Sequence, residues 1–447
     1  MLNYKKSGFG NLCTFFVLVI LTASQISCKI KNDPVADAKE KRLHANAMAI
    51  HEYTLNVAKE KKAAYENFMN QLSFEEKVFQ LFIENLDGKS VFHPKESIEV
   101  NGKKIDVIPG GYLFFAFNLA EDPQGIISFT NSIQNYCIDN SYVRPFLAID
   151  HEGGPVNRLR NINAPLPSCE VIGKSYTLEE ASRIYEYQAL QMQNLGFTMN
   201  LAPVVEVCSD DNKDFLSGRS FGDAKATLVY STVCVRAYED NGVSTVLKHF
   251  PGNTNTDPHS GLPEIKLSEE EIRKTLEPFI EVLKEKPAAV LMSHAIVESV
   301  DPKTPSCLSE KWVTDILRNE LNFQGVIFSD DIFMAALKNN GFTTDKAVVM
   351  AIEAGIDCIM ISGKEIAVPV KVLLEKAEKD AAFKNKLEVA AKRIIDYKIE
   401  TGLLAYVPHK DGTYTIENAG LKKTPQQQLE QFNIAKKLNN EEYKRGM

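Results

Sequence analysis

Four residues in one short stretch of the sequence have the side chains needed for acid–base chemistry. Lys248 and His249 end an apolar segment, and Asp257 and His259 follow soon after. A cationic group beside a hydrophobic core is costly unless it is paired, so Lys248 and His249 predict a carboxylate or a hydroxyl-rich ligand close by. In Asp257-x-His259 the carboxylate can hold one imidazole nitrogen while the other exchanges protons near neutral pH. A solvated turn is the alternative interpretation of that pair.

A second apolar segment ends in two carboxylates. Residues 326–328 lead into Ser329, Asp330 and Asp331. Asp330 is a candidate nucleophile, or an electrostatic partner for a cationic transition state. Asp331 is a candidate cap for the helix that follows.

A third apolar segment ends in Asp150-His151-Glu152-Gly153-Gly154. Asp150 suits the hydroxyl groups of a sugar. The two glycines allow a sharp turn or a close approach of the backbone to a ligand.

These polar residues follow strands of a predicted parallel sheet, because short apolar segments alternate with segments of helical period along the chain. The predicted strands are residues 80–84, 111–115, 146–150, 198–203, 244–250, 289–294, 326–330 and 357–361. The predicted helices include residues 177–195, 268–284, 309–320 and 346–354. In a barrel of eight βα units the active site lies at the carboxyl ends of the strands. The predicted fold class is therefore α/β, a (β/α)8 TIM-type barrel forming a single catalytic domain, with a doubly wound open sheet as the alternative.

The composition is that of a folded protein. Of 447 residues, 44% are hydrophobic and 25% are charged, which excludes disorder, collagen and coiled coil. The 51 Lys and Arg against 59 Asp and Glu leave a net charge of −8. No nucleic-acid partner is expected, because nucleic acid binding calls for a basic face.

The N-terminus predicts export. Lys5 and Lys6 precede an apolar segment, residues 13–23, which is too short to span a bilayer but suits a signal peptide. Residues 1–27 are predicted to be a signal peptide of lipoprotein type, because the sequence up to Cys28 resembles a bacterial lipobox. Cys28 would carry the lipid that anchors the chain to a membrane, periplasmic or at the cell surface. Ordinary cleavage nearby is the alternative.

The rest of the chain divides into three predicted parts. Residues 29–72 form a helical lead-in rich in Ala, Lys and Glu, residues 73–402 form the catalytic barrel, and residues 403–447 form a polar C-terminal tail. The cysteines from Cys137 onward contain no C-x-x-C pair and are predicted to be structural.

Five motifs in order resemble the bacterial β-N-acetylglucosaminidases of glycoside hydrolase family 3, the NagZ type. The motifs are Ile149-Asp150-His151-Glu152-Gly153-Gly154, Ala202-Pro203-Val204, Arg219-Ser220-Phe221-Gly222, Lys248-His249-Phe250-Pro251-Gly252 through Asp257-x-His259, and Phe328-Ser329-Asp330-Asp331. The resemblance runs from about residue 73 to residue 402.

This resemblance implies an exo-acting retaining β-N-acetylhexosaminidase that releases terminal GlcNAc from peptidoglycan fragments or other glycans. Asp330 would form the glycosyl-enzyme, while His259, oriented by Asp257, would protonate the leaving oxygen and then activate water. The terminal sugar of a β-linked GlcNAc-containing saccharide would be held by Asp150, Arg219, Lys248 and His249. No cofactor and no metal are expected.

Two departures from the family pattern leave alternatives open. Asn253 stands where the family commonly has His, in a loop shorter than usual, and Pro155 stands where a basic residue is frequent. The alternatives are a β-glucosidase or glycoside phosphorylase of the same fold, and a catalytically impaired sugar-binding surface lipoprotein. A metal hydrolase using His249, His259, His294 and Asp330 is a further alternative, although no H-E-x-x-H spacing supports it.

Overall fold

The structure is a computed structural model that describes residues 34–100, 102–257 and 261–445. The chain forms two compact units. The described part of the first is helix α2 with the segment Tyr406–Glu417, and the second is Leu72–Ala405 with the chain from Asn418 onward. Residues 1–27 and Cys28, predicted as signal peptide and lipid anchor, lie outside the described residues.

The first unit is built on the long helix α2 (Pro34–Gln71), which lies within the predicted helical lead-in. The strands β15 (Leu404–Pro408) and β16 (Tyr414–Asn418) form a two-stranded sheet. Lys61 Nζ lies 5.1 Å from the ring centroid of Tyr406 and 5.6 Å from that of Tyr414, so α2 and the hairpin meet through a cation between two aromatic rings. Within the described part of the chain, no helix combines the length and the apolar character needed to cross a membrane.

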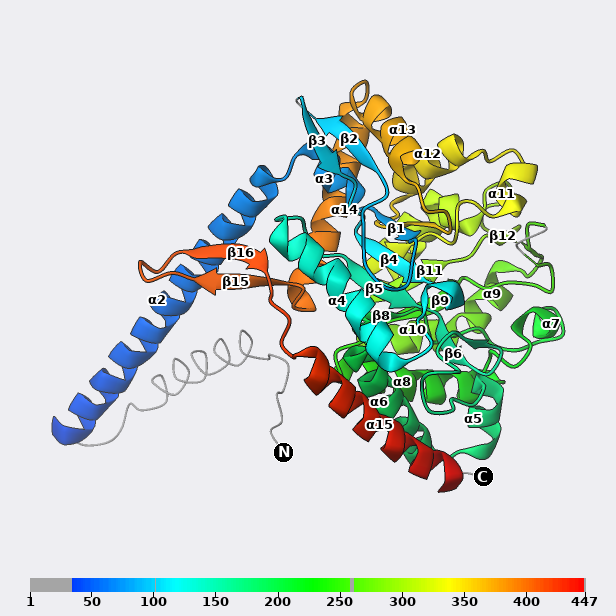
Figure 1. The fold of residues 1–447 in the computed structure, drawn as a ribbon, viewed down its shortest axis with the longest axis horizontal. Helices are drawn as coiled ribbons and strands as arrows, with labels where there is room; N and C mark the ends of the chain where they lie inside the picture. Colours follow the sequence, from blue (N-terminus) through cyan, green and yellow to red (C-terminus); the bar gives the residue numbers. More distant parts are fainter. Residues whose placement is uncertain (1–33, 101, 258–260, 446–447) are drawn as a thin grey trace. The chain divides into compact units, whose positions relative to one another are not determined.

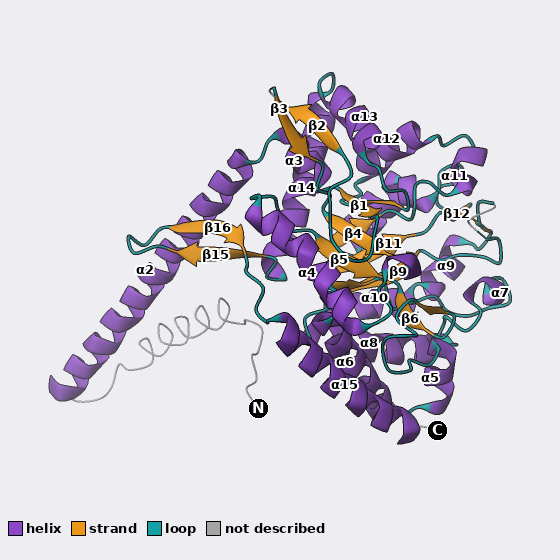
Figure 2. Cartoon of the chain, viewed as in Figure 1, coloured by secondary structure: helices purple, strands orange, loops and turns teal. Residues whose placement is uncertain are grey.

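The second unit is a barrel of eight parallel strands surrounded by helices (Figures 1 and 2). The strands are β1 (Phe82–Asn85), β4 (Gly111–Phe114), β5 (Phe146–Ile149), β8 (Met199–Asn200), β9 (Ser244–Phe250), β11 (Ala289–Met292), β13 (Val326–Phe328) and β14 (Ile359–Ile361). Their order is β13-β11-β9-β8-β5-β4-β1-β14, and each neighbouring pair is parallel. A parallel bridge between Phe328 and Cys358 joins β13 to the start of β14 and closes the ring. The predicted (β/α)8 barrel is confirmed.

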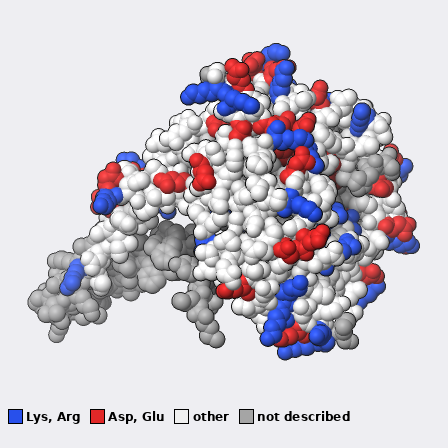
Figure 3. Space-filling model, in the orientation of Figure 1, with Lys and Arg blue, Asp and Glu red and all other residues white. Residues whose placement is uncertain are grey.

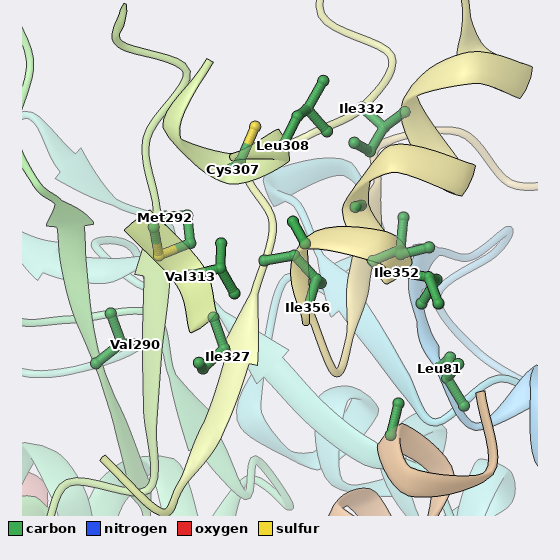
Figure 4. Close-up of a cluster of buried hydrophobic side chains, with 14 of the residues drawn as sticks. Leu81, Val290, Met292, Cys307, Leu308, Val313, Ile327, Ile332, Ile352 and Ile356 are labelled. Carbon is green, nitrogen blue, oxygen red and sulfur yellow. The ribbon is translucent and has the colours of Figure 1, made fainter. Parts of the chain in front are cut away.

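Side chains alternate across the barrel wall because successive residues of a strand point to opposite faces. On β11, Leu291 belongs to the cluster inside the barrel, together with Phe146 and Phe328, whose rings meet edge to face at 5.9 Å. Val290 and Met292 point outward into the helix layer. Figure 4 shows this outer cluster between the strands and the helices.

The helices of the barrel layer are α3 (Phe74–Phe79), α4 (Pro123–Asp139), α5 (Cys169–Ser175), α6 (Leu178–Asn194), α7 (Lys213–Leu216), α8 (Ala224–Asp240), α9 (Glu269–Thr275), α10 (Glu277–Val282), the π-helix η4 (Lys311–Glu320), α11 (Ala335–Asn339), α12 (Thr344–Ala354), α13 (Ala367–Ala377) and α14 (Ala381–Glu400). Most of these helices lie between consecutive barrel strands in the sequence, whereas α3 precedes the first strand and α13 and α14 follow the last. Three short 3-10 helices are also present among the described residues: η1 (Ala116–Asn118), η2 (Leu283–Glu285) and η3 (Ser306–Leu308). Outside the barrel, two-stranded sheets pair β2 (Ser97–Val100) with β3 (Lys103–Asp106), β6 (His151–Gly153) with β7 (Val156–Asn157), and β10 (Glu264–Ile265) with β12 (Ile296–Val297).

Two predicted elements differ from the observed ones for reasons of backbone chemistry. The predicted strand 198–203 is only Met199–Asn200, because Pro203 has no N–H to donate to a ladder. The predicted helix 268–284 is divided into α9, α10 and η2. The division falls just before Pro278, which sits in the first turn of α10, where a missing N–H is tolerated.

The predicted polar tail, residues 403–447, contains β15, β16 and the helix α15 (Pro425–Arg445). This helix lies along α6 in Figure 1 and buries Phe432 completely in the core of the second unit. Asn439 Oδ1 accepts a hydrogen bond from Gln191 of α6 at 3.2 Å. Residues 418–445 therefore pack as part of the barrel unit.

The face of the second unit drawn in Figure 3 carries acidic and basic side chains side by side. A nucleic-acid-binding face concentrates one sign of charge.

Candidate active site

The candidate nucleophile lies at the carboxyl end of β13. Asp330 is 9% exposed, and its Oδ1 accepts a hydrogen bond from the backbone N–H of Asp331 at 2.8 Å. Asp331 has a different role, because its Oδ1 accepts N–H groups from Phe333 at 3.0 Å and Ser362 at 2.9 Å. Asp331 thus joins the loops after β13 and β14, and Asp330 stays the candidate nucleophile of the two.

The buried imidazole of His294 is hydrogen-bonded to the loop that carries Asp330 and Asp331. His294 Nε2 lies 3.0 Å from the carbonyl oxygen of Asp331, which can only accept, so this nitrogen carries the proton. The other nitrogen lies 3.2 Å from Cys307 Sγ. Burial raises the pKa of the Cys307 thiol well above its ordinary value, so the thiol keeps its proton and donates. His294 therefore holds the backbone that carries the Asp330-Asp331 pair.

Four charged side chains meet where β5 and β9 end. Lys248 Nζ lies 2.8 Å from Asp150 Oδ1 and 2.6 Å from Glu152 Oε1. Arg219 donates to both oxygens of Glu152, at 2.8 and 2.9 Å. Lys248 and Glu152 are almost completely buried, while 17% of the Asp150 side chain and 14% of the Arg219 side chain remain exposed. The cluster thus offers one carboxylate and one guanidinium to the barrel mouth.

The charges of this cluster keep one another ionised. Burial by itself would raise the pKa of Glu152, but Lys248 and Arg219 together outweigh burial and lower that pKa to about 2. Burial would lower the pKa of Lys248, and Asp150 and Glu152 overcome this effect and raise it. A site that keeps ionised groups in fixed positions can recognise hydroxyl groups without reorganising.

His249 has its own carboxylate partner. Its Nδ1 lies 2.6 Å from Glu206 Oε1, and both side chains are buried. The ring edge of Phe215, from α7, lies against the imidazole with the centroids 5.9 Å apart. Glu206 lies six residues after the end of β8, whereas Asp150 directly follows β5, so the rule of a polar residue at a strand end did not identify Glu206.

Arg158 is a further cation at this mouth that sequence reasoning missed. Its backbone N–H donates to the carbonyl oxygen of Asp150 at 3.3 Å, which places it beside a predicted sugar ligand. Its guanidinium carbon lies 5.8 Å from the ring centroid of Phe115, and among the described residues its buried Nε has no hydrogen-bond partner.

His151, which lies between Asp150 and Glu152, is structural. Its Nε2 lies 2.9 Å from Gln188 of α6, and burial lowers the pKa of the ring to about 4. A neutral histidine bonded to the helix layer does not belong to the mouth of the barrel. The motif therefore combines two charged site residues with one residue that holds the strand to its helix.

The predicted acid–base pair is only partly described. The backbone carbonyl oxygen of Asp257 accepts a hydrogen bond from the backbone N–H of Gly261 at 3.0 Å. His259 lies outside the described residues, so the roles of Asp257 and His259 stay predictions. Among the described residues, no group of three or more His, Cys, Asp or Glu side chains is arranged to hold a metal ion.

A cavity of about 690 Å³ lies next to Glu206, between the segments 206–212 and 251–256. Asn253, Thr254 and Thr256 contribute to one wall, and Ile265 and Phe279 lie on an apolar side. Residues 251–256, which lead to Asp257, therefore line this cavity.

The chain is similar to proteins of known family over most of the barrel. The family model described as Glycosyl hydrolase family 3 N terminal domain matches residues 74–397. A beta-hexosaminidase of Pseudomonas aeruginosa is 33% identical over 256 residues, which cover 56% of this chain and 73% of that protein. Beta-hexosaminidase A of Pseudoalteromonas piscicida is 29% identical over 351 residues, 72% of this chain, and the chain spans little more than half of that relative, 57%.

A solved structure extends the likeness to three dimensions. The structure of a glycoside hydrolase family 3 beta-N-acetylglucosaminidase from Paenibacillus superposes with a TM-score of 0.67 at 25% identity, covering 82% of this chain and 69% of that one. The family match spans far more than half of the sequence and includes each barrel strand. The resemblance carried by the five motifs is confirmed: this chain belongs to glycosyl hydrolase family 3.

Proposed function

We propose that the protein is an exo-acting retaining β-N-acetylhexosaminidase that hydrolyses terminal GlcNAc from peptidoglycan fragments or other glycans. The observation that carries the proposal is the shared face: Asp330 follows β13 on the barrel end where β5 and β9 present Asp150 and Lys248. The names of the family relatives, beta-hexosaminidase and beta-N-acetylglucosaminidase, support GlcNAc as the sugar.

The first half of the reaction forms a covalent glycosyl-enzyme. Asp330 attacks the anomeric carbon as the glycosidic bond breaks, and the leaving oxygen takes a proton from His259. The N–H of Asp331 orients the Asp330 carboxylate for this attack. Asp150, Arg219, Lys248 and His249 hold the terminal sugar, whose hydroxyl groups match the ionised oxygens and N–H groups of the cluster.

The second half returns the enzyme to its starting state. His259, now neutral and oriented by Asp257, removes a proton from water, and that water displaces Asp330 from the anomeric carbon. Two inversions leave the product with the β configuration of the substrate. The site needs no cofactor for either step.

Location belongs to the same proposal. The segment of residues 13–23 and Cys28 support export and a lipid anchor, with the barrel held at a periplasmic or cell-surface membrane. Metabolic labelling with a fatty-acid analogue tests this part: labelled wild type and unlabelled Cys28→Ala support the anchor, and equal labelling of both contradicts it.

The activity is tested with the full chain on p-nitrophenyl β-N-acetylglucosaminide and p-nitrophenyl β-glucoside. We expect turnover selective for the first substrate, β-GlcNAc as the first product seen by NMR, and a loss of about a thousandfold or more in Asp330→Asn. Asp315→Asn, on the exposed face of η4, is the matched control and keeps full activity.

Other outcomes assign the alternatives. Turnover that requires phosphate and releases a sugar phosphate indicates a phosphorylase. Preference for the glucoside indicates a β-glucosidase. Sugar binding by a folded protein that turns over neither these substrates nor chitobiose indicates a binding lipoprotein.

A further inference from the structure

Glu206 receives hydrogen bonds from two different parts of the candidate active site. His249 Nδ1 lies 2.6 Å from its Oε1, and the backbone N–H of Asn253 donates to its Oε2 at 2.7 Å. Asn253 Nδ2 adds a longer bond to Oε1 at 3.3 Å. Only 2% of the Glu206 side chain is exposed, so neither bond competes with bulk water.

The first contact determines which nitrogen of His249 faces the ligand. A carboxylate only accepts, so Nδ1 carries the proton that points at Glu206. The ring of Phe215 lies against the imidazole at an angle of 62° and restricts its rotation. The Nε2 edge of His249 is therefore the edge left to meet a sugar.

The second contact holds the start of the segment that leads to Asp257. Asn253 is buried, and its N–H bond to Glu206 attaches the segment to the chain after β8. Further along, Asn255 donates from its backbone N–H to the Asp211 carbonyl oxygen and from Nδ2 to the Asp210 carbonyl oxygen at 2.8 Å. The segment is thus tied down at two points before Asp257.

A third contact reaches the segment that carries Arg219. The hydroxyl of Ser220 donates to the backbone carbonyl oxygen of Glu206 at 2.7 Å. The neighbouring residue, Arg219, forms the ion pair with Glu152. One residue therefore connects three elements of the site without itself belonging to the Asp150–Lys248–Arg219 cluster.

We propose that Glu206 is a positioning residue: its carboxylate aligns His249 for the sugar and, through Asn253, anchors the segment that leads to Asp257. This role rests on the proposed function, because the reaction it serves is glycoside hydrolysis. Groups that orient reacting side chains act by preorganisation, so small displacements of those side chains are costly in rate.

The test compares Glu206→Gln with Glu264→Gln in the full chain. Glu264 lines the same cavity but is exposed, and it bonds to Lys266 on the surface. Two substrates are used: p-nitrophenyl β-N-acetylglucosaminide, whose leaving group departs without a proton, and chitobiose, whose leaving sugar needs one. An amide oxygen cannot replace a carboxylate toward both N–H donors.

We expect Glu206→Gln to lower kcat/KM about 10- to 100-fold on the p-nitrophenyl substrate. The loss on chitobiose is expected to be larger, because the proton-donor segment is released as well. Glu206→Asp, which keeps the charge, should recover part of the loss, and Glu264→Gln should match wild type. Kinetics of Glu206→Gln within twofold of wild type on both substrates would overturn the proposal.

A spectroscopic readout separates positioning from a general loss of structure. A short Nδ1–H bond to a carboxylate shifts the imidazole proton far downfield in the NMR spectrum. This signal should vanish in Glu206→Gln and in His249→Asn and persist in Glu264→Gln. Persistence of the signal in Glu206→Gln overturns the assignment, and if that variant does not fold, Glu206→Asp is measured in its place with the same criterion.

The design also separates this proposal from the proposed function. An inactive wild type on both substrates contradicts the hydrolase function, whatever the variants do. An active wild type with an unaffected Glu206→Gln contradicts the positioning role alone.

Discussion

Arg219 and Glu152 face each other in a two-pronged ion pair, with Nε 2.8 Å from Oε2 and Nη2 2.9 Å from Oε1. Lys248 adds a third cationic contact to Glu152 at 2.6 Å. Glu152 is thus the centre on which two predicted sugar ligands depend. Its charge holds them in place when no sugar is bound.

Neutralising Glu152 should therefore destabilise the fold. Glu152→Gln leaves Lys248 and Arg219 buried with one carboxylate fewer, and removing one partner from a buried ion pair costs about 3 kcal/mol or more. Glu285→Gln is the control, since Glu285 makes the same two-pronged contact with Arg236 at the surface, where such pairs contribute less than about 1 kcal/mol. The free energy of unfolding in urea is measured for wild type, Glu152→Gln and Glu285→Gln. Equal losses in the two variants would mean that burial does not strengthen the Glu152 cluster.

The barrel could be predicted because its strands are continuous apolar runs buried on both faces, a pattern visible without knowing any partner. Seven of the eight predicted segments contain one barrel strand, and the predicted segment 80–84 overlaps β1, which ends one residue later at Asn85. Asp150, Lys248 and Asp330 could be found for the same reason, because each follows such a run. Their chemistry is local in the sequence.

Glu206 and Arg158 could not be assigned roles from local pattern. Glu206 contacts His249, 43 positions away, and Arg158 lies over the ring of Phe115, which follows the strand β4. The packing of helix α15 could not be predicted from composition either, because most of its residues are polar and its one fully buried aromatic ring is that of Phe432. Such roles depend on which elements the closed barrel brings together.

The packing of α15 leads to a second prediction. Phe432 is fully buried among residues of α4 and α6, so Phe432→Ala should lower the free energy of unfolding by about 3 to 5 kcal/mol. Ile434, two positions along the same helix, is 61% exposed, and Ile434→Ala should change stability by less than about 0.5 kcal/mol. A small effect of Phe432→Ala in urea unfolding would mean that the barrel is stable without this helix.

A third prediction concerns pH. Lys398 is buried at the foot of the barrel with its Nζ 2.6 Å from Gln80 Oε1, and burial lowers its pKa from 10.5 to about 7. Because the folded pKa lies below the unfolded one, the unfolded chain binds the extra proton between pH 7 and 10.5, and wild-type stability rises with pH across that window. Below about pH 7 the buried amine is protonated in the folded protein too, and the full cost of burying its charge lowers the stability.

Lys398→Met removes this titration and its penalty. In urea unfolding, the free energy of unfolding of the variant should exceed that of wild type most at pH 6. This difference should become steadily smaller toward pH 10. Lys89→Met, an exposed lysine with the same change, should show a gap that does not vary with pH. A constant gap for Lys398→Met would mean that the amine stays charged in the folded protein.

Arg158 gives the fourth prediction, which bears on sugar binding. Its backbone N–H is bonded to Asp150 and its guanidinium lies over Phe115. The side chain is half-buried, so we expect the accessible part of the guanidinium to donate to a sugar hydroxyl. Arg158→Lys keeps the charge but loses the planar set of donors. We expect kcat/KM on p-nitrophenyl β-N-acetylglucosaminide to fall about 10- to 100-fold, mainly through a higher KM. Arg160→Lys is the matched control, because Arg160 already donates to the carbonyl oxygens of Asn157 and Pro155. If both variants retain wild-type KM, Arg158 does not touch the sugar, and its stacking on Phe115 serves the loop after β5 instead.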